Sequence, residues 1–205
     1  LRPEGDIVRS TTGIASGPLS FMRLFDTLVD TIKQGGKRRG AQMGMLFWWH
    51  PDIERFITSK SGELKDVQLQ NFNISVAIDD YFMQKALRGE DIYLINPREC
   101  PCLYKTWGEE FVRCYEGCIE AIKAGKVRIW RRVNAKELWD KIVKSAWDSG
   151  DPGLWNRDLA NYINNEKLPG EVINATNPCS EESLYDFESC NLGSINLVKY
   201  VHDGK

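Results

Sequence analysis

A helical pattern of apolar positions follows Pro18. Within residues 18–34 apolar side chains recur at intervals of three and four, which is the spacing of one face of an α-helix. Proline is favoured in the first turn of a helix, and the pair Gly35-Gly36 stops the pattern. The sequence therefore predicts an amphipathic helix with an apolar stripe made of Phe21, Phe25, Leu28, Val29 and Ile32.

Two strand-like segments come next. Residues 41–49 are mostly apolar, and in residues 72–78 apolar side chains alternate with smaller or polar ones, as in a β-strand. A short helix over residues 51–60 is predicted between them, and a helix capped by Asp79 or Asp80 and ended by Gly89 is predicted after them. A later helix is indicated by Leu138, Trp139, Ile142, Val143, Ala146 and Trp147. Because helices and strands alternate, the predicted fold class is α/β with parallel strands.

Composition and charge narrow the class of protein. The chain has 205 residues, of which 42% are hydrophobic and 27% are charged, and this suits one sizeable core. No apolar run approaches the length of a membrane span and no signal segment opens the chain, so we expect cytoplasmic residence. A net charge of -2 without a polybasic stripe argues against binding a nucleic-acid polymer, whereas cationic clusters at 37–39 and 128–132 favour small phosphates.

The segment Asn177-Pro178-Cys179-Ser180-Glu181 sets a thiol between an amide and a carboxylate. Proline stiffens this turn and biases Asn177 toward an extended conformation. In a locally extended strand, Asn177, Cys179 and Glu181 would point to the same face and would combine a reactive sulfur, a hydrogen-bond donor and a base. The alternative is a structural thiol beside a capping Asn and a surface Glu. A second thiol, Cys190, follows closely in sequence.

Several motifs in the same order along the chain resemble ribonucleotide reductases. They are Leu1-Arg2-Pro3-Glu4-Gly5-Asp6, Gln34-Gly35-Gly36-Lys37-Arg38-Arg39-Gly40-Ala41, Trp49-His50-Pro51-Asp52-Ile53-Glu54-Arg55-Phe56, the segment from Asn177 to Glu181, and Cys190-Asn191-Leu192-Gly193-Ser194-Ile195-Asn196-Leu197. The resemblance runs along nearly the whole chain and is weakest in a cysteine-containing insert at about residues 98–133. The Gly-rich motif and the spacing from Cys179 to Cys190 are most similar to the adenosylcobalamin-dependent class II enzymes. Ser180 departs from the glycine usual in this family.

The resemblance implies part of a ten-stranded α/β barrel with a central finger loop at about residues 174–197. It implies reduction of ribonucleoside di- or triphosphates by thiyl-radical chemistry, with adenosylcobalamin as cofactor. Cys179 would take the 3′ hydrogen atom, Glu181 would be the base for the 3′ hydroxyl, and Asn177 would orient the substrate. Cys190 and a second thiol elsewhere would supply reducing equivalents, and a thioredoxin- or glutaredoxin-like protein would restore them. The family also allows a homodimer.

Two alternatives stay open. The chain could belong to a class I large subunit, in which a separate subunit generates the radical, or to a non-catalytic nucleotide-binding regulatory module. Because the chain begins at Leu1 rather than Met, and its first residues already resemble a loop of the family, we expect a fragment that is inactive alone.

Residues 1–42 carry the candidate effector loops. The loop from Lys33 to Gln42 reads by itself as a helix end whose cations complement the helix dipole. The resemblance matches it to the specificity loop that connects a dNTP or ATP effector to the substrate base, which implies allosteric control of specificity. The implied effector residues are Gln34, Lys37, Arg38 and Arg39, together with Arg2 in the preceding loop.

Four further cysteines form the pairs Cys100-x-Cys102 and Cys114-x-x-x-Cys118. Four paired thiols invite a tetrahedral zinc site, although the spacing is not that of a standard zinc knuckle. The alternative is a set of core residues, since Phe111, Cys114, Cys118 and Ile122 fall at helical intervals. The two histidines are isolated, and His50 before Pro51 reads as a turn or helix-start residue rather than a metal ligand.

Overall fold

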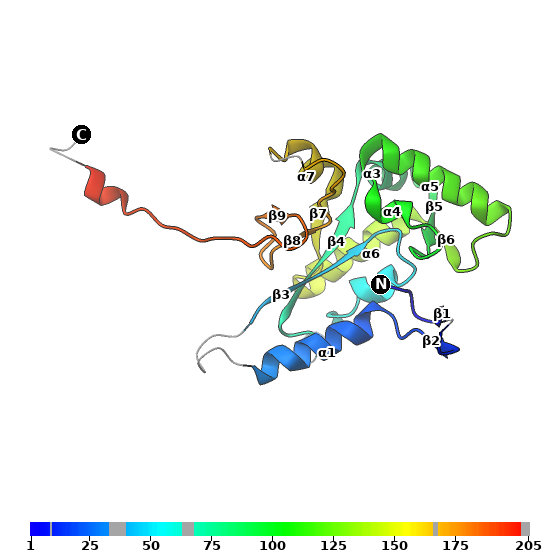
Figure 1. Ribbon diagram of the computed structural model, residues 1–205, viewed down its shortest axis with the longest axis horizontal. Helices are drawn as coiled ribbons and strands as arrows, with labels where there is room; N and C mark the ends of the chain where they lie inside the picture. Colours follow the sequence, from blue (N-terminus) through cyan, green and yellow to red (C-terminus); the bar gives the residue numbers. More distant parts are fainter. Residues whose placement is uncertain (9, 33–39, 63–67, 166–167, 202–205) are drawn as a thin grey trace.

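The fold is a mixed α/β arrangement, shown in Figure 1. The computed structural model describes residues 1–8, 10–32, 40–62, 68–165 and 168–201. The strands are β1 (Ile7–Val8), β2 (Gly13–Ile14), β3 (Gln42–Phe47), β4 (Phe72–Ile78), β5 (Asp91–Ile95), β6 (Trp130–Asn134), β7 (Gly153–Asn156), β8 (Ala175–Thr176) and β9 (Ser183–Leu184). The helices are α1 (Pro18–Thr31), α2 (Ile53–Ile57), α3 (Asp80–Arg88), α4 (Cys102–Lys105), α5 (Gly108–Lys123), α6 (Ala135–Ser149), α7 (Arg157–Ile163) and the 3-10 helix η2 (Leu197–Tyr200).

A three-stranded parallel sheet in the order β3-β4-β7 forms the centre of the structure. Gln42 pairs with Phe72 at one end of β3 and β4, and Ser75 pairs with Gly153 where β7 joins β4. Six of the seven residues of β4 are buried, as expected for a central parallel strand that is covered on both faces. The prediction of an α/β fold with parallel strands is confirmed, and the ten-stranded barrel stays a prediction for the longer protein.

The predicted helices form, with one difference in how α1 is used. Asp79 caps α3 by accepting from the Phe82 amide at 2.7 Å, and Gly89 ends that helix in a left-handed conformation. On α1, however, Phe21, Phe25 and Leu28 stay roughly half exposed, while Met22 is buried. The amphipathic helix is therefore confirmed, but most of its predicted stripe is exposed.

An aromatic core links the sheet to α3 and α5. Trp48 directly follows β3, is fully buried, and stacks on Phe82 with ring centroids 5.3 Å apart. Its indole N–H donates to the carboxylate of Asp79 at 2.7 Å. Burial raises the pKa of Asp79 to about 7, because removal from water disfavours the charged form more than these hydrogen bonds favour it.

The insert at residues 98–133 contains α4 and α5 and ends within an antiparallel pair that β6 makes with β5. The hydroxyl of Tyr115 on α5 donates to the carbonyl of Tyr93 on β5 at 2.8 Å and accepts from its amide at 2.7 Å. These two bonds fasten the long helix α5 to the β5–β6 pair.

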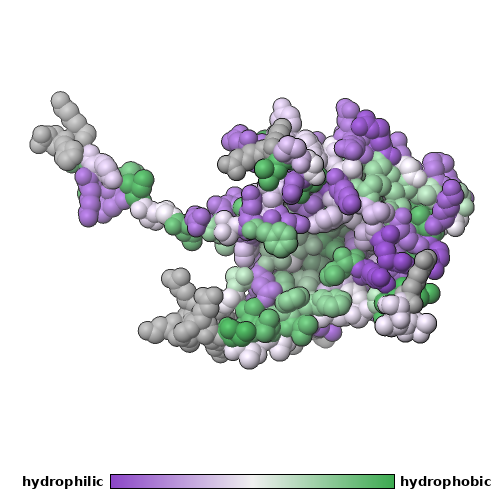
Figure 2. Space-filling view, viewed as in Figure 1, coloured by the Kyte–Doolittle hydropathy of each residue, from purple (hydrophilic) through white to green (hydrophobic). Residues whose placement is uncertain are grey.

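The segment after Tyr185 projects away from the rest of the structure (Figure 1). Residues 189–196, which include Cys190, form no regular element here. A strand needs a neighbouring strand to satisfy its backbone, and no described strand pairs with these residues. Their apolar side chains, including Leu192 and Ile195, are exposed, and Figure 2 shows such side chains along the projecting segment. Within the described parts of the chain, no helix is both long and apolar enough to cross a membrane.

Candidate functional site

The Cys179 loop is the tip of a small hairpin between β8 and β9. Thr176 pairs with Ser183, and inside this pair the amide of Asn177 donates to the carbonyl of Glu182 at 3.1 Å. The amide of Ser180 donates to the carbonyl of Asn177 at 3.0 Å. These bonds fold residues 177–182 into a closed turn rather than a locally extended strand.

Ser180 adopts a left-handed backbone with φ of 66°. This region is readily occupied by glycine and costs other residues free energy, since the side chain crowds the backbone. The geometry gives a physical reason for the glycine that is usual here in the resembled family. It also shows that the Ser180 departure is accommodated, with the hydroxyls of Ser180 and Thr176 3.4 Å apart.

The three candidate side chains of the loop have different surroundings. Cys179 is a free thiol exposed at the tip, and Glu181 is also exposed. Asn177 is buried, and its side-chain oxygen accepts from the Glu182 amide at 3.1 Å. Asn177 thus stabilises the turn that presents the thiol. Because residues 177–182 form a turn and not a strand, alternation along a strand does not place the Asn177 amide and the Glu181 carboxylate on one face.

The loop is fixed to the central sheet from two sides. Asn73, the second residue of β4, donates from its side chain to the carbonyl of Pro178 at 2.7 Å. The indole N–H of Trp155 on β7 donates to the Ser183 hydroxyl at 3.0 Å. Asn73 is therefore a structural hydrogen-bonder that holds the Cys179 loop against β4.

Cys190 is a free, exposed thiol whose partner in this structure is Glu182. Desolvation, followed by contact with the Glu182 carboxylate, raises the pKa of Cys190 and favours the protonated thiol. The other carboxylate oxygen, Glu182 Oε2, is buried and accepts no hydrogen bond from any residue that the structure describes. Sequence reasoning had singled out Glu181 and missed Glu182, although the two are adjacent. Glu182 brings the two cysteine motifs together.

Arg157 is a second residue that the sequence did not reveal. Its guanidinium is buried and donates to the carbonyls of Leu103 and Tyr104 on α4, at 2.9 and 2.6 Å. It also donates to the side-chain oxygen of Asn174 at 2.8 Å, just before β8. Arg157 therefore ties the insert to the strand that leads into the Cys179 loop.

The four cysteines of the insert come together. Cys102 and Cys114 are joined by a disulfide, and the sulfur of Cys118 lies 3.9 Å from that of Cys102. The sulfurs of these three residues all lie within 4.8 Å of one another. Cys100 completes the group through its contact with Cys118, which raises the pKa of the Cys100 thiol. The clustering is observed, and the metal stays a prediction.

The effector residues are only partly within the described chain. Gln34, Lys37, Arg38 and Arg39 lie outside the described residues. The guanidinium of Arg2 donates to the carbonyl of Ile7 at 3.2 Å and so helps to close the first loop.

Two residues from elsewhere in the chain, Arg98 and His50, bind the same first loop. Asp6 forms a bidentate ion pair with Arg98 at 2.7 and 2.9 Å, which lowers the pKa of Asp6. The ring of His50 accepts from the amide of Asp52 and pairs through its other nitrogen with the carbonyl of Leu1 at 3.2 Å, so Nε2 carries the proton. His50 is thus a structural residue, as its sequence position indicated.

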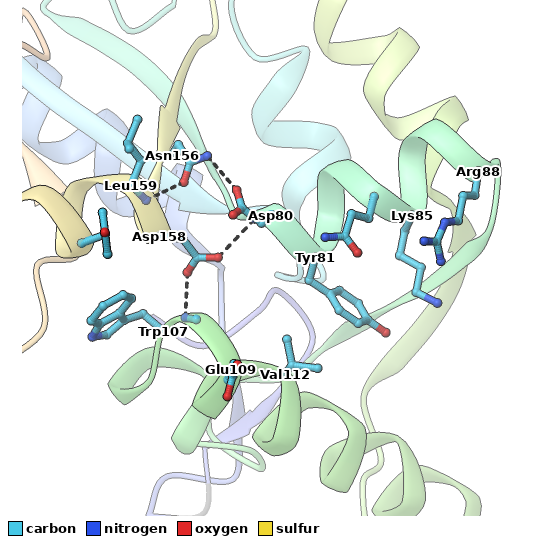
Figure 3. A pocket seen from close by; sticks show the side chains of 13 residues that line it. Asp80, Tyr81, Lys85, Arg88, Trp107, Glu109, Val112, Asn156, Asp158 and Leu159 are labelled. Carbon is cyan, nitrogen blue, oxygen red and sulfur yellow. Dashed lines mark hydrogen bonds between the residues drawn. The ribbon is translucent and has the colours of Figure 1, made fainter.

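A cavity of about 780 Å³ lies beyond the carboxyl end of β4 (Figure 3). Asp158 accepts there from the amides of Asp80 and Gly108, at 3.2 and 2.8 Å, while Tyr81 and Lys85 line another side. Asn73, the anchor of the Cys179 loop, lies seven residues before Asp80, or roughly 20 Å at ~3.3 Å per residue. This cavity and the reactive thiol are therefore separate features.

Comparison with known proteins identifies the family. The family described as "Ribonucleotide reductase, barrel domain" matches residues 1–205. The chain belongs to the ribonucleotide reductase barrel-domain family.

Individual reductases match along the whole chain. The vitamin B12-dependent ribonucleoside-diphosphate reductase of Thermoplasma acidophilum is 47% identical over 205 residues, which are 100% of this chain and 23% of that protein. The protein of the same name from Mycobacterium tuberculosis is 42% identical and covers 100% of this chain and 25% of its own length. The ribonucleoside-diphosphate reductase subunit alpha of Chlamydia pneumoniae is 30% identical, covering 100% of this chain and 20% of its own length. The chain thus spans about a quarter or less of the relatives it matches.

The names of two of these reductases describe them as vitamin B12-dependent. Cys179 is exposed on its hairpin and lines neither the cavity of about 780 Å³ nor the two smaller cavities of about 170 Å³. These three cavities therefore supply no cobalamin site beside Cys179.

Proposed function

We propose that the protein containing this chain is a ribonucleotide reductase that converts ribonucleotides to deoxyribonucleotides through a thiyl radical at Cys179. The observation that carries the proposal is the presentation of a free, exposed thiol on a hydrogen-bonded hairpin. Family membership selects this chemistry among the reactions open to an exposed thiol. The hairpin fixes the backbone of the thiol, and this is what a hydrogen-atom transfer requires of its carrier.

The chemical roles follow from what each group can do. The 3′ carbon–hydrogen bond has no useful acidity, so a sulfur radical at Cys179 removes it as a hydrogen atom and becomes a thiol. Glu181 takes the proton of the 3′ hydroxyl, which helps to expel the 2′ hydroxyl as water. Asn177 orients the substrate by hydrogen bonding.

The reducing equivalents come from two thiols. Cys190 and a second cysteine elsewhere in the protein give two electrons and two protons, and they close into a disulfide. The balance is ribonucleotide plus two thiols giving deoxyribonucleotide, water and one disulfide, which a thioredoxin- or glutaredoxin-like dithiol reopens. The raised pKa of Cys190 beside Glu182 keeps this thiol protonated until it reacts.

Adenosylcobalamin dependence and effector control complete the proposal. The names of the first relatives favour the B12-dependent branch and a diphosphate substrate. The proposed contacts of a dNTP or ATP effector are Arg2, Gln34, Lys37, Arg38 and Arg39. The enzyme would be a cytoplasmic homodimer. The central sheet of this chain would form one part of its ten-stranded barrel.

A cofactor assay of the intact protein tests the branch. With a ribonucleoside diphosphate and a dithiol reductant, we expect deoxyribonucleotide formation only when adenosylcobalamin is added. Activity that needs a separate metal-bearing subunit would instead support the class I alternative. Nucleotide binding with no reduction under either condition would support the regulatory-module alternative.

A further inference from the structure

The insert gathers four of the six cysteines of the chain within nineteen residues, from Cys100 to Cys118. Cys114 and Cys118 lie one helical turn apart on α5, so they present their sulfurs on the same side of the helix. Cys102 begins α4, and Cys100 comes two residues earlier. Two short stretches of chain therefore bring two thiols each to one place.

The sulfurs of Cys102 and Cys118 have the separation of two ligands in a tetrahedral metal site, whereas Cys114 is disulfide-bonded to Cys102 and becomes a separate ligand only after reduction. Zinc binds thiolates at about 2.3 Å, so two sulfurs of one tetrahedron lie about 3.8 Å apart. Cys102 and Cys118 are separated by 3.9 Å, and Cys114 lies within 4.8 Å of both. Cys100 lies outside this group of three sulfurs but contacts Cys118. Cys100 and Cys118 are buried, and Cys102 and Cys114 are partly buried, so the group is largely shielded from solvent, as in a closed structural site.

The helix that carries Cys102 needs an attachment of this kind. The helix α4 has only four residues, and Pro101 before it gives no side-chain cap. A helix this short has little stability of its own, because nucleation costs more than one turn of hydrogen bonds returns. A cross-link to the sixteen-residue helix α5 holds it in place.

We propose that Cys100, Cys102, Cys114 and Cys118 bind one structural zinc ion when all four are reduced. The Cys102–Cys114 disulfide is the metal-free form of the same cluster. A dithiol reductant gives two electrons and two protons to this disulfide and becomes a disulfide itself. The four resulting thiols release four protons as they bind Zn²⁺, leaving a site with a net charge of -2. This zinc proposal does not depend on the proposed reductase activity.

The metal would also stabilise the approach to the Cys179 loop. The carbonyls of Leu103 and Tyr104 on α4 hold the guanidinium of Arg157, which in turn holds Asn174. Fixing α4 through zinc therefore fixes the acceptors on which Arg157 depends.

Metal analysis of the intact protein, purified with a reductant and without oxygen, is the direct test. We expect about one zinc per chain from this site, and a loss of that ion in the double variant Cys102→Ser/Cys118→Ser. Cys190→Ser is the matched control, because its thiol is exposed and outside the cluster, and it keeps the zinc. Replacement of zinc by cobalt gives thiolate-to-cobalt charge-transfer absorption in the wild-type protein and not in the double variant. Equal zinc in the double variant and the wild type would overturn the proposal.

Alkylation of the wild-type protein tests the site without relying on a variant that folds. With zinc bound, peptide mass spectrometry should find Cys179 and Cys190 modified and the four cluster cysteines protected. A chelator should then make all four reactive. If the reduced protein takes up no zinc and the Cys102–Cys114 disulfide re-forms in its presence, the cluster is a disulfide site and the proposal fails.

Discussion

Arg157→Met is the substitution that most sharply tests how the insert supports the Cys179 loop. It removes three hydrogen bonds of 2.6 to 2.9 Å. The guanidinium carbon of Arg157 lies 4.9 Å from the centre of the Phe47 ring, and the unbranched apolar side chain of Met keeps packing against that ring. Hydrogen bonds that involve a charged group contribute about 1.5–3 kcal/mol each, or about 4–9 kcal/mol for three.

Burial of the cation offsets part of this stabilisation. Desolvation lowers the pKa of Arg157 to about 10 from 12.5, and at 1.36 kcal/mol per pKa unit this corresponds to about 3 kcal/mol. The difference between these two values predicts that Arg157→Met lowers the free energy of unfolding by about 3 kcal/mol, because three oxygens lose their hydrogen-bond donor. For a domain of this size, that corresponds to a fall in Tm of about 6–12 °C.

The assay is calorimetry of the intact protein, with Arg113→Met as the matched control. Arg113 is exposed on α5 and forms a long ion pair with Glu109 at 3.9 Å, so its loss should cost less than about 0.5 kcal/mol. Hydrogen exchange should also speed up at residues 173–177 in Arg157→Met and not in the control. Equal melting temperatures and equal exchange in the two variants would refute the bridging role of Arg157.

Two further predictions concern Asp79 and Ser180. The folded pKa of Asp79, about 7, lies above its unfolded value of 3.8, so its stabilising contribution is complete below pH 3.8 and is lost as pH rises through 7, by up to about 4 kcal/mol. Asp79→Asn should therefore flatten the fall in Tm between about pH 4 and pH 7, and parallel pH profiles of the two proteins would contradict this. Ser180→Gly should stabilise the protein by about 0.5–1 kcal/mol because glycine adopts the φ of 66° without strain, whereas Ser180→Val should destabilise it. Chemical denaturation ranks the three proteins, and a glycine variant less stable than the valine variant would contradict the strain argument.

The elements that were predictable are those whose signal is local. Pro18 marks the start of α1, and Asp79 and Gly89 bracket α3 as an N-cap and a left-handed end. The apolar run over residues 72–78 became the central strand β4. In each case, neighbouring residues in the sequence supply the hydrogen bonds or the periodicity that decides the structure.

The features that were missed depend on residues far apart in the sequence. An isolated Arg157 reads as a surface residue, and only the folded chain brings the carbonyls of α4 and Asn174 to it. Pro178 indicated a stiff turn, but not that Asn177 closes it through both its backbone and its side chain by bonding to Glu182 and Ser180. The glycine usual at position 180 in the family was the available signal for a left-handed residue.

The central claim is that Cys179 carries the radical of ribonucleotide reduction. The most direct measurement is deoxyribonucleotide formation by the intact Cys179→Ala protein, with ribonucleotide binding measured in the same preparation. Because Cys179 is exposed at the tip of its hairpin and makes no disulfide, its truncation should leave folding and nucleotide binding intact. We predict unchanged binding and no detectable reduction, and reduction at the wild-type rate would contradict the claim.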